Sequence, residues 1–544
     1  MAGCFDARRG LRPMKNSTLR KGGDVPTPRA GNSQVSPTRK VWSVAMRTIT
    51  ITAAILFCLM SATLPAQSPP TSSPPEQVQA VTALPETPAG KQFAAWLAAV
   101  NTGRRETLRQ FISENYAPPP NGSLPVDQIT DRQFKSFNDT GGFDVRKIAA
   151  SSPEKIAVVV QAKRTEKWMV IGMTVGAQSP HNILGMGFRN TEAPADLLPR
   201  DKLTDQEIRD KVDGFLTKLV EADAFSGVVL IAKDGRPIYQ RASGLASRTW
   251  NAPNRIDTKF NIASIGKMFT AVAIAQLVEK GKLSYEDTLG TILPDYPNKD
   301  WAQKVTVHHL LTHTSGLAEN HPSGDKPFRQ GFRTVKEYLS SSSAHDTLKF
   351  EPGSRLEYSS YGYLVLGAII EKASGQDYYD YVREHIYQPA DMTDSDCYDL
   401  DTDPPNLATG YMDAPNRTRR SNIFMLPVKG LPYGLGYSTA EDLVKFAQAL
   451  GSQKLLDAKS TDLIWTGQVD YTEPDSRYGY GFIVKRYNGT RIIGHGGGWV
   501  GITNKFEMYP DLGYTVVILS NIDSDPNSIA SKLREWLTQG LSRE

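Results

Sequence analysis

The apolar positions of this chain change their spacing along its length, and the change predicts where helices and strands lie. Near residues 205 and 530, apolar residues recur every three or four positions, as on the buried face of a helix. Short runs rich in valine, isoleucine and leucine stand beside these segments and are typical of strands. We predict helices at 205–222, 269–283, 363–370 and 527–541, and strands at 225–232, 237–242, 491–493 and in a C-terminal pair that ends with 516–521.

The predicted strands come from the two ends of this region, and most of the helical pattern comes from its middle. The charged turn 233–236 separates the first two strands, which is a hairpin signal. The last strands are followed by a closing helix. We therefore expect an α/β domain at 203–541 with one antiparallel sheet assembled from both of its ends.

A smaller module is predicted at 90–195. Apolar residues recur at helical spacing between Phe93 and Val100, and runs at 156–160 and 168–175 predict strands. Helices followed by strands indicate a small α+β domain. It shows no catalytic constellation, so we expect a docking or spacer module, with a binding pocket of its own as the alternative.

The segments before this module predict export. Residues 1–45 form a basic disordered tail, unless the true start lies at Met46. Residues 46–66 have the basic, apolar and small-residue regions of a signal peptide, and the apolar run is shorter than the roughly 20 residues that span a membrane. Residues 67–89 are a linker rich in proline and serine. We expect a periplasmic or secreted protein, or a membrane-anchored one if the signal segment is not cleaved.

Composition agrees with a globular exported enzyme. The chain has 544 residues, of which 40% are hydrophobic, enough for a sizeable core. A net charge of +4 is small for this length, and nothing indicates nucleic acid as a partner. After cleavage Cys397 is the one remaining cysteine, which excludes an internal disulfide in the mature chain.

Ser264 and Lys267 stand in the first turn of the helix predicted around 269–283. Three residues turn an α-helix by about 300° and rise by roughly 4.5 Å, so the Lys267 ammonium reaches the Ser264 hydroxyl on one face. A serine hydroxyl is a poor nucleophile until a neighbour takes its proton, and the positive end of a helix favours an anion there. The pair is therefore a candidate nucleophile and proton partner.

Two other segments stand at informative positions. The segment 351–360 places Tyr358 in a turn just before an apolar helical run, and the segment 494–499 reads GHGGGW after a short strand. Trp499 either lines a pocket or packs in the core. The segment at 313–316 is predicted to close a helix and brace the cleft.

Four histidines, His308, His309, His313 and His321, lie close together in the sequence. They lack the H-E-x-x-H spacing of a metal site and have no matched carboxylate. We therefore predict no metal and no cofactor.

The serine, tyrosine and glycine segments resemble, in order and spacing, the three motifs of the serine β-lactamase and penicillin-binding protein superfamily, in its class C and esterase-like branch. Segments at 310–317 and 434–443 are also similar, and the resemblance covers 203–541. It implies a β-lactamase-like α/β domain, with an antiparallel sheet flanked by helices and a mostly helical region beside it.

The resemblance also implies roles for the candidate residues. Ser264 is the acylated nucleophile, Lys267 its proton partner, and Tyr358 a phenolic base made acidic by the lysine. The backbone N–H groups of Ser264 and Gly498 form the oxyanion hole. Ser360, His495, Gly496 and Gly497 stand at the positions that bind substrate.

Two of these positions depart from the pattern of the family. Ser360 replaces an asparagine and is a shorter donor, and His495 replaces a lysine and is mostly neutral at pH 7. Both changes disfavour a β-lactam substrate. We expect a serine hydrolase that acts on small-molecule esters or D-amino-acid peptide amides, with a β-lactamase proper, or a non-catalytic cell-wall-binding module that kept the fold, as alternatives.

Overall fold

A computed structural model describes residues 83–119, 122, 124–318, 331–341, 348–413, 418–472 and 475–541. The predicted basic tail, the signal peptide, most of the linker and His321 lie outside the described residues. All of the described residues belong to one compact unit, Glu76–Glu544. Within them, every helix is too short or too polar to cross a membrane.

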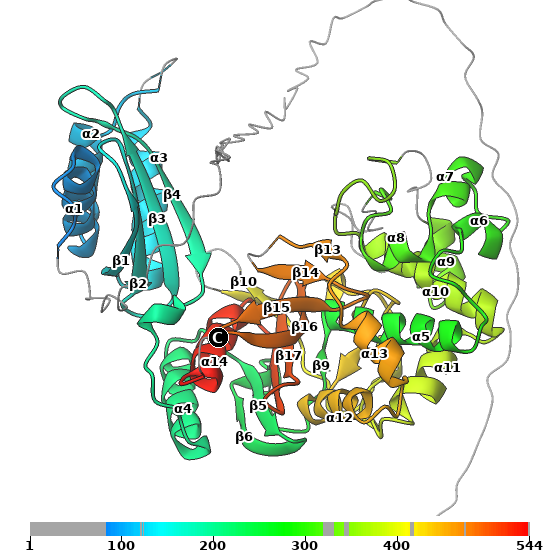
Figure 1. The fold of residues 1–544 in the computed structure, drawn as a ribbon. Coiled ribbons are helices and arrows are strands. Elements are labelled where there is room, and N and C mark those ends of the chain that lie inside the picture. Colours follow the sequence, from blue (N-terminus) through cyan, green and yellow to red (C-terminus); the bar gives the residue numbers. More distant parts are fainter. Residues whose placement is uncertain are drawn as a thin grey trace, which may run out of the picture. The chain divides into compact units, whose positions relative to one another are not determined.

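The N-terminal part of this unit has three helices followed by four strands (Figure 1). The helices pack on an antiparallel sheet of order β1-β2-β3-β4, and Phe93, Trp96 and Ile171 lie in their common core. The predicted helix-then-strand order is confirmed; the domain boundaries stay a prediction. The elements are α1 (Pro88–Asn101), α2 (Arg105–Asn115), α3 (Val126–Thr140), β1 (Phe143–Ser151), β2 (Lys155–Ala162), β3 (Trp168–Val175) and β4 (Ile183–Thr191).

The larger sheet has eight strands in the order β13-β14-β15-β16-β17-β18-β5-β6. β18 pairs antiparallel with β5, so strands from the two ends of this region are neighbours in one sheet, as the sequence predicted. The strands are β5 (Gly227–Lys233), β6 (Arg236–Ser243), β13 (Val469–Asp470), β14 (Ser476–Tyr478), β15 (Ile483–Tyr487), β16 (Thr490–Trp499), β17 (Ile502–Tyr509) and β18 (Tyr514–Ser520).

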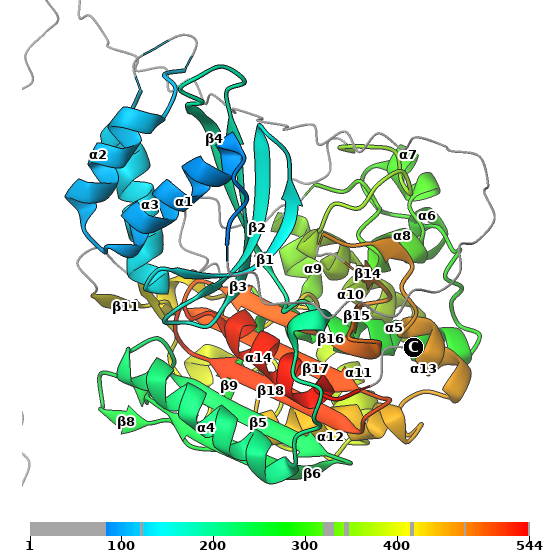
Figure 2. The same ribbon diagram turned by 60° about the vertical axis from the view of Figure 1, so that its left-hand side comes forward.

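Both faces of this sheet are covered, which explains why its central strands are apolar almost throughout. In β5, Val228 and Leu230 face one core, and Val229 and Ile231 face the other, because successive side chains point to opposite sides. Helices α4 (Asp205–Glu221) and α14 (Pro526–Thr538) cover the second core, as Figure 2 shows. On the opposite face α12 (Ala440–Gly451) packs against β5 and β18.

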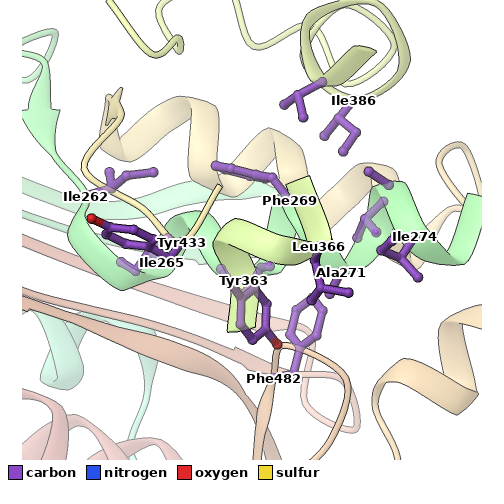
Figure 3. Packing of buried hydrophobic residues seen from close by; sticks show 14 of the residues in the cluster. Ile262, Ile265, Phe269, Ala271, Ile274, Tyr363, Leu366, Ile386, Tyr433 and Phe482 are labelled. Atoms are coloured by element: carbon purple, nitrogen blue, oxygen red, sulfur yellow. The ribbon is translucent and has the colours of Figure 1, made fainter. Parts of the chain in front are cut away.

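The helical region is built around α5 (Lys267–Glu279), whose side chains are buried on all sides from Lys267 to Leu277. Figure 3 shows Phe269, Ala271 and Ile274 of this helix among residues of other elements. The other helices are α6 (Leu289–Ile292), α7 (Lys299–Lys304), α8 (Val307–Leu311), α9 (Val335–Ser341), α10 (Ser360–Ser374), α11 (Tyr378–Val382) and α13 (Ala458–Ile464). The short strands are β7 (Leu245–Ser247), β8 (Ala252–Pro253), β9 (Phe260–Asn261), β10 (Tyr411–Asp413), β11 (Arg419–Ser421) and β12 (Tyr437–Ser438).

Two of the differences between the predicted and the observed elements concern the segments that carry Ser264 and Gly498. Ser264 lies in a 3-10 turn, Ala263–Gly266, that leads into α5, and not in an α-helical turn. β16 continues to Trp499, although the sequence predicted that the strand ends at 493. Glycine weakens a strand, but β16 pairs with β17 as far as Trp499, and this pairing extends the strand through the glycines.

Candidate active site

The turn that carries Ser264 is fixed by its neighbours in sequence and in space. The side chain of Asn261 accepts a hydrogen bond from Ala263 N at 3.0 Å and donates one to Leu435 O at 3.0 Å. Ala263 has a φ of 45°, a left-handed conformation that costs a non-glycine residue free energy. Such strain is common at functional sites, and here it occurs next to the half-buried Ser264.

Lys267 lies directly beneath Ser264 and is buried. Its ammonium donates to Ser264 Oγ at 3.2 Å, to Ser360 Oγ at 3.4 Å and to the carbonyl of Tyr433 at 3.0 Å. The same nitrogen lies 4.8 Å from the centre of the Tyr358 ring. The structure therefore brings the predicted serine, lysine and tyrosine together, and it adds a backbone carbonyl that holds the lysine in place.

Tyr358 lies in the segment that leads into α10. Ser359 caps this helix, since its hydroxyl accepts a hydrogen bond from Gly362 N at 3.3 Å. The imidazole of His313, on the turn after α8, lies against the Tyr358 ring with 4.2 Å between the ring centres. The predicted brace at 313–316 therefore contacts the candidate base directly.

A cavity of about 260 Å³ opens above these groups. Its lining contains no charged side chain within the described part of the chain. The residues that line it are Ala263, Ser264, Tyr358, Ser360, Tyr433, Leu435, Gly498 and Trp499. Trp499 therefore lines the pocket, and its indole N–H donates to Met425 O at 2.8 Å.

His495 is buried behind the cavity and is absent from its lining, together with Gly496 and Gly497. Its Nδ1 lies 2.5 Å from Gly496 O and therefore carries the proton, so Nε2 accepts a hydrogen bond from the Tyr478 hydroxyl at 3.0 Å. Burial, and then the charge of Lys267, lower the His495 pKa to about 3. His495 is neutral and both of its nitrogens are paired, so substrate contacts of these three residues stay a prediction.

Gly498 borders the cavity on a strand edge that has no strand partner. β15 pairs with β16 only as far as Gly494, and beyond it the described strands leave one edge of β16 open. A Cβ atom at Gly498 would meet nothing within 4 Å. The open edge and the Ser264 turn therefore border the same space, where the predicted oxyanion hole would lie.

Two functional contacts were missed by the sequence reasoning. Tyr433 holds Lys267 through its carbonyl and lines the cavity with its ring, and Tyr478 pairs with His495. Tyr433 stands one residue before the segment 434–443, which carried part of the family resemblance. That resemblance could have marked Tyr433 as a residue close to the site. Nothing in the local pattern marks Tyr478.

Comparisons with known proteins agree with this geometry. Residues 209–538 match the family model described as Beta-lactamase. The solved structure of a penicillin-binding protein from Bacillus halodurans is 33% identical, with a TM-score of 0.53 over 61% of this chain and 99% of that chain. Esterase EstB of Burkholderia gladioli is 32% identical over 43% of this chain and 59% of its own length.

A D-amino acid amidase from Ochrobactrum anthropi SV3, solved with L-phenylalanine amide, is 25% identical, with a TM-score of 0.54 over 62% of this chain and all of that chain. The match to the family model extends from helix α4 to helix α14 and includes every residue of the cavity lining. The predicted fold class is thereby confirmed. The chain belongs to the Beta-lactamase family of serine hydrolases, in which it is similar to a penicillin-binding protein and to an esterase.

Proposed function

We propose that this protein is an exported hydrolase that cleaves uncharged esters and D-amino-acid amides through an acyl-enzyme on Ser264. The observation that carries the proposal is the 3.2 Å hydrogen bond from the Lys267 ammonium to Ser264 Oγ, beside Tyr358 and at the floor of an uncharged cavity. The export part rests on the signal-like segment 46–66.

The first half-reaction follows from the positions of these groups. An ammonium donates protons and cannot accept one, so the proton of Ser264 passes to the phenolate of Tyr358 as Oγ attacks the substrate carbonyl carbon. The carbonyl oxygen gains the negative charge, which the backbone N–H groups of Ser264 and Gly498 would stabilise by a few kcal/mol. Tyr358 then gives the proton to the departing alcohol or amine, and the acyl group stays on Ser264.

The second half-reaction uses the same groups with water. Tyr358 takes a proton from a water molecule as its oxygen attacks the acyl carbonyl, and then returns a proton to Ser264 Oγ as the carboxylic acid leaves. Lys267 takes no proton in this scheme, and its hydrogen bond orients Ser264 Oγ. The cycle regenerates the free serine.

The uncharged lining supports esters and neutral amides over substrates that carry a carboxylate. The described lining residues offer a carboxylate no cation, and His495 is neutral and lies behind the wall. The Lys267 ammonium at the floor already donates to Ser264, Ser360 and the Tyr433 carbonyl. The similarity to an esterase and to a D-amino acid amidase supports the same choice. A β-lactamase is the second candidate and rests on the family match alone.

A covalent label tests the proposal. A fluorophosphonate probe should react once per molecule, and peptide mapping should find it on Ser264; Ser264→Ala should lose both the label and the hydrolysis of p-nitrophenyl butyrate. Ser360→Ala, which removes a hydroxyl from the same cavity, is the matched control and should still be labelled. A label on another residue, or no label in a folded wild type, would contradict the proposal. Labelling by penicillin with turnover of nitrocefin would favour the second candidate.

A further inference from the structure

His313 is hydrogen bonded on both sides of Tyr358. Its carbonyl accepts from Glu357 N at 2.9 Å, and its Nδ1 accepts from Ser359 N at 3.1 Å. The residues just before and just after the tyrosine are therefore attached to one histidine, while the imidazole lies against the phenol ring. His313 has a φ of 59°, and this left-handed conformation directs its backbone and its ring toward the same segment.

The hydrogen bonds also define the form of the imidazole. Because Nδ1 accepts, the ring proton is on Nε2, which is buried and has no hydrogen-bond partner among the residues that the structure describes. Burial comes first, followed by the charge of Lys267 and the neighbouring His495, and together they hold the His313 pKa well below its usual range. The other groups that face the ring, Tyr363 and Tyr478, are neutral phenols.

A buried N–H without a partner is unfavourable, so the other contacts of the imidazole must outweigh that cost. His313 contacts the active site through Nδ1, which accepts from Ser359 N, and through its ring face, which lies against Tyr358. A charged imidazole would lose the acceptor for Ser359 and would place a second cation near Lys267. The neutral Nε2–H form is therefore the one that fits between lysine and tyrosine.

We propose that His313 is the positioning residue for Tyr358: it fixes the phenol beside Lys267 by stacking against it and by holding the backbone on both sides. The proposal rests on the proposed function in one respect, because it takes Tyr358 to be the group that transfers the proton. His313 lines no part of the cavity, so its effect is on the chemical step and not on substrate binding.

Two substitutions separate the contacts. His313→Leu removes the ring and the acceptor, and a tyrosine displaced by even 1 Å lowers kcat by up to about 100-fold, with KM within about twofold. His313→Asn keeps an acceptor near the Nδ1 position and tolerates positive φ, so it should recover about tenfold of that loss. The acid limb of the kcat/KM profile should shift in both variants, because the base is less well held.

His309→Asn is the matched control. His309 lies in α8, four residues before His313, is half-buried, and accepts through Nδ1 from Thr306 N in the capping box of that helix. It should lower the melting temperature and leave kcat per folded molecule unchanged. If folded His313→Leu keeps the wild-type kcat and pH profile, or if His309→Asn lowers kcat equally, the proposal is wrong.

A measurement that does not depend on turnover distinguishes a failure of the His313 proposal from a failure of the proposed function. Nitrogen NMR of His313 should show a neutral ring with an unprotonated Nδ1 from pH 5 to 9, and the Ser359 amide should exchange much faster in His313→Leu. An Nδ1–H form or a charged ring would overturn the positioning role. A wild type that hydrolyses no ester would instead contradict the proposed function, with these NMR results still deciding on His313.

Discussion

The cavity has two walls, and each has a buried histidine near Lys267. The two histidines make different contacts. In the tyrosine wall, residues 357–360, the side chains of Tyr358 and Ser360 face the cavity and His313 supports them from behind. In the strand wall, residues 494–499, Gly498 and Trp499 border the cavity and His495 is turned inward to Tyr478. Burial, and then the charge of Lys267, lower the pKa of both histidines, but the His313 ring lies closer to Tyr358, with 4.2 Å between ring centres against 6.3 Å for His495.

This difference shows why the two walls have different residues. A wall that reacts through side chains needs a brace that fixes their backbone, and His313 supplies three contacts to one short segment. A wall that acts through its backbone needs close approach instead. Gly497 illustrates this, because a Cβ atom there would lie 2.2 Å from Ile262 O, just before the nucleophile turn.

The largest expected effect comes from removing the charge of Lys267, which lies near both walls. Lys267→Met should lower kcat/KM for p-nitrophenyl butyrate by about 1,000-fold or more, and Tyr358→Phe should do the same, because both act in one proton transfer. The double variant should be no worse than either single one. Losses that add in free energy would contradict a shared relay. In Lys267→Met, NMR titration should also show a higher pKa for His313 and for His495.

A second test compares neighbouring glycines of the strand wall. Gly497→Ala forces a methyl group against the Ile262 carbonyl and should destabilise the protein by roughly 1–3 kcal/mol and disturb the turn of Ser264. Gly498→Ala meets open space and should melt within a few degrees of the wild type. Chemical denaturation and label incorporation measure both variants. Equal stability of the two would show that the close approach to Ile262 is not needed.

The buried histidines predict a loss of stability in acid. Each is neutral in the native state, because its pKa there is lowered, and takes up a proton in the unfolded chain below its ordinary pKa near 6.5. Stability therefore falls as the pH drops below about 6.5. Between pH 7.5 and 5 one such histidine accounts for about 2 kcal/mol. Urea unfolding of His495→Asn and His313→Asn should each show a pH dependence weaker by that amount. An unchanged dependence would mean that the ring is protonated in the native state.

The smallest expected effect tests Ser360 in the tyrosine wall. Ser360→Asn supplies a longer donor for the amide of a β-lactam and should raise the ratio of nitrocefin to p-nitrophenyl butyrate kcat/KM by roughly three- to tenfold, the value of one hydrogen bond. His495→Lys, in the strand wall, should not raise this ratio, because the side chain is directed away from the cavity. A larger gain in this ratio from His495→Lys than from Ser360→Asn would mean that the strand wall, and not the tyrosine wall, sets the preference between the two substrates.

Local contacts were predictable from the sequence and distant ones were not. The Ser264–Lys267 pair follows from helical spacing, and the role of Tyr358 follows from the family resemblance of the segment before an apolar helix. The contact between Lys267 and the Tyr433 carbonyl joins residues 166 positions apart and has no local signature. The glycines of β16 have a low strand propensity, so the predicted strand stopped at 493; pairing with β17 outweighs that propensity. The direction of His495 likewise depends on its neighbour Tyr478.

The pairing of β5 with β18 has a consequence for synthesis and folding. Ser226 and Ser520, which meet at the end of this pair, are 294 positions apart. A ribosome therefore releases β5 and β6 long before their partner, and the β5 edge stays unpaired while the nucleophile helix and most of the cavity are made. Long-range pairing of this kind folds slowly, and an open apolar strand edge tends to aggregate. The nascent hydrolase region should depend on chaperones until β18 emerges, and chains that stop before β18 should be insoluble and inactive even though they contain Ser264, Lys267, Tyr358 and Gly498.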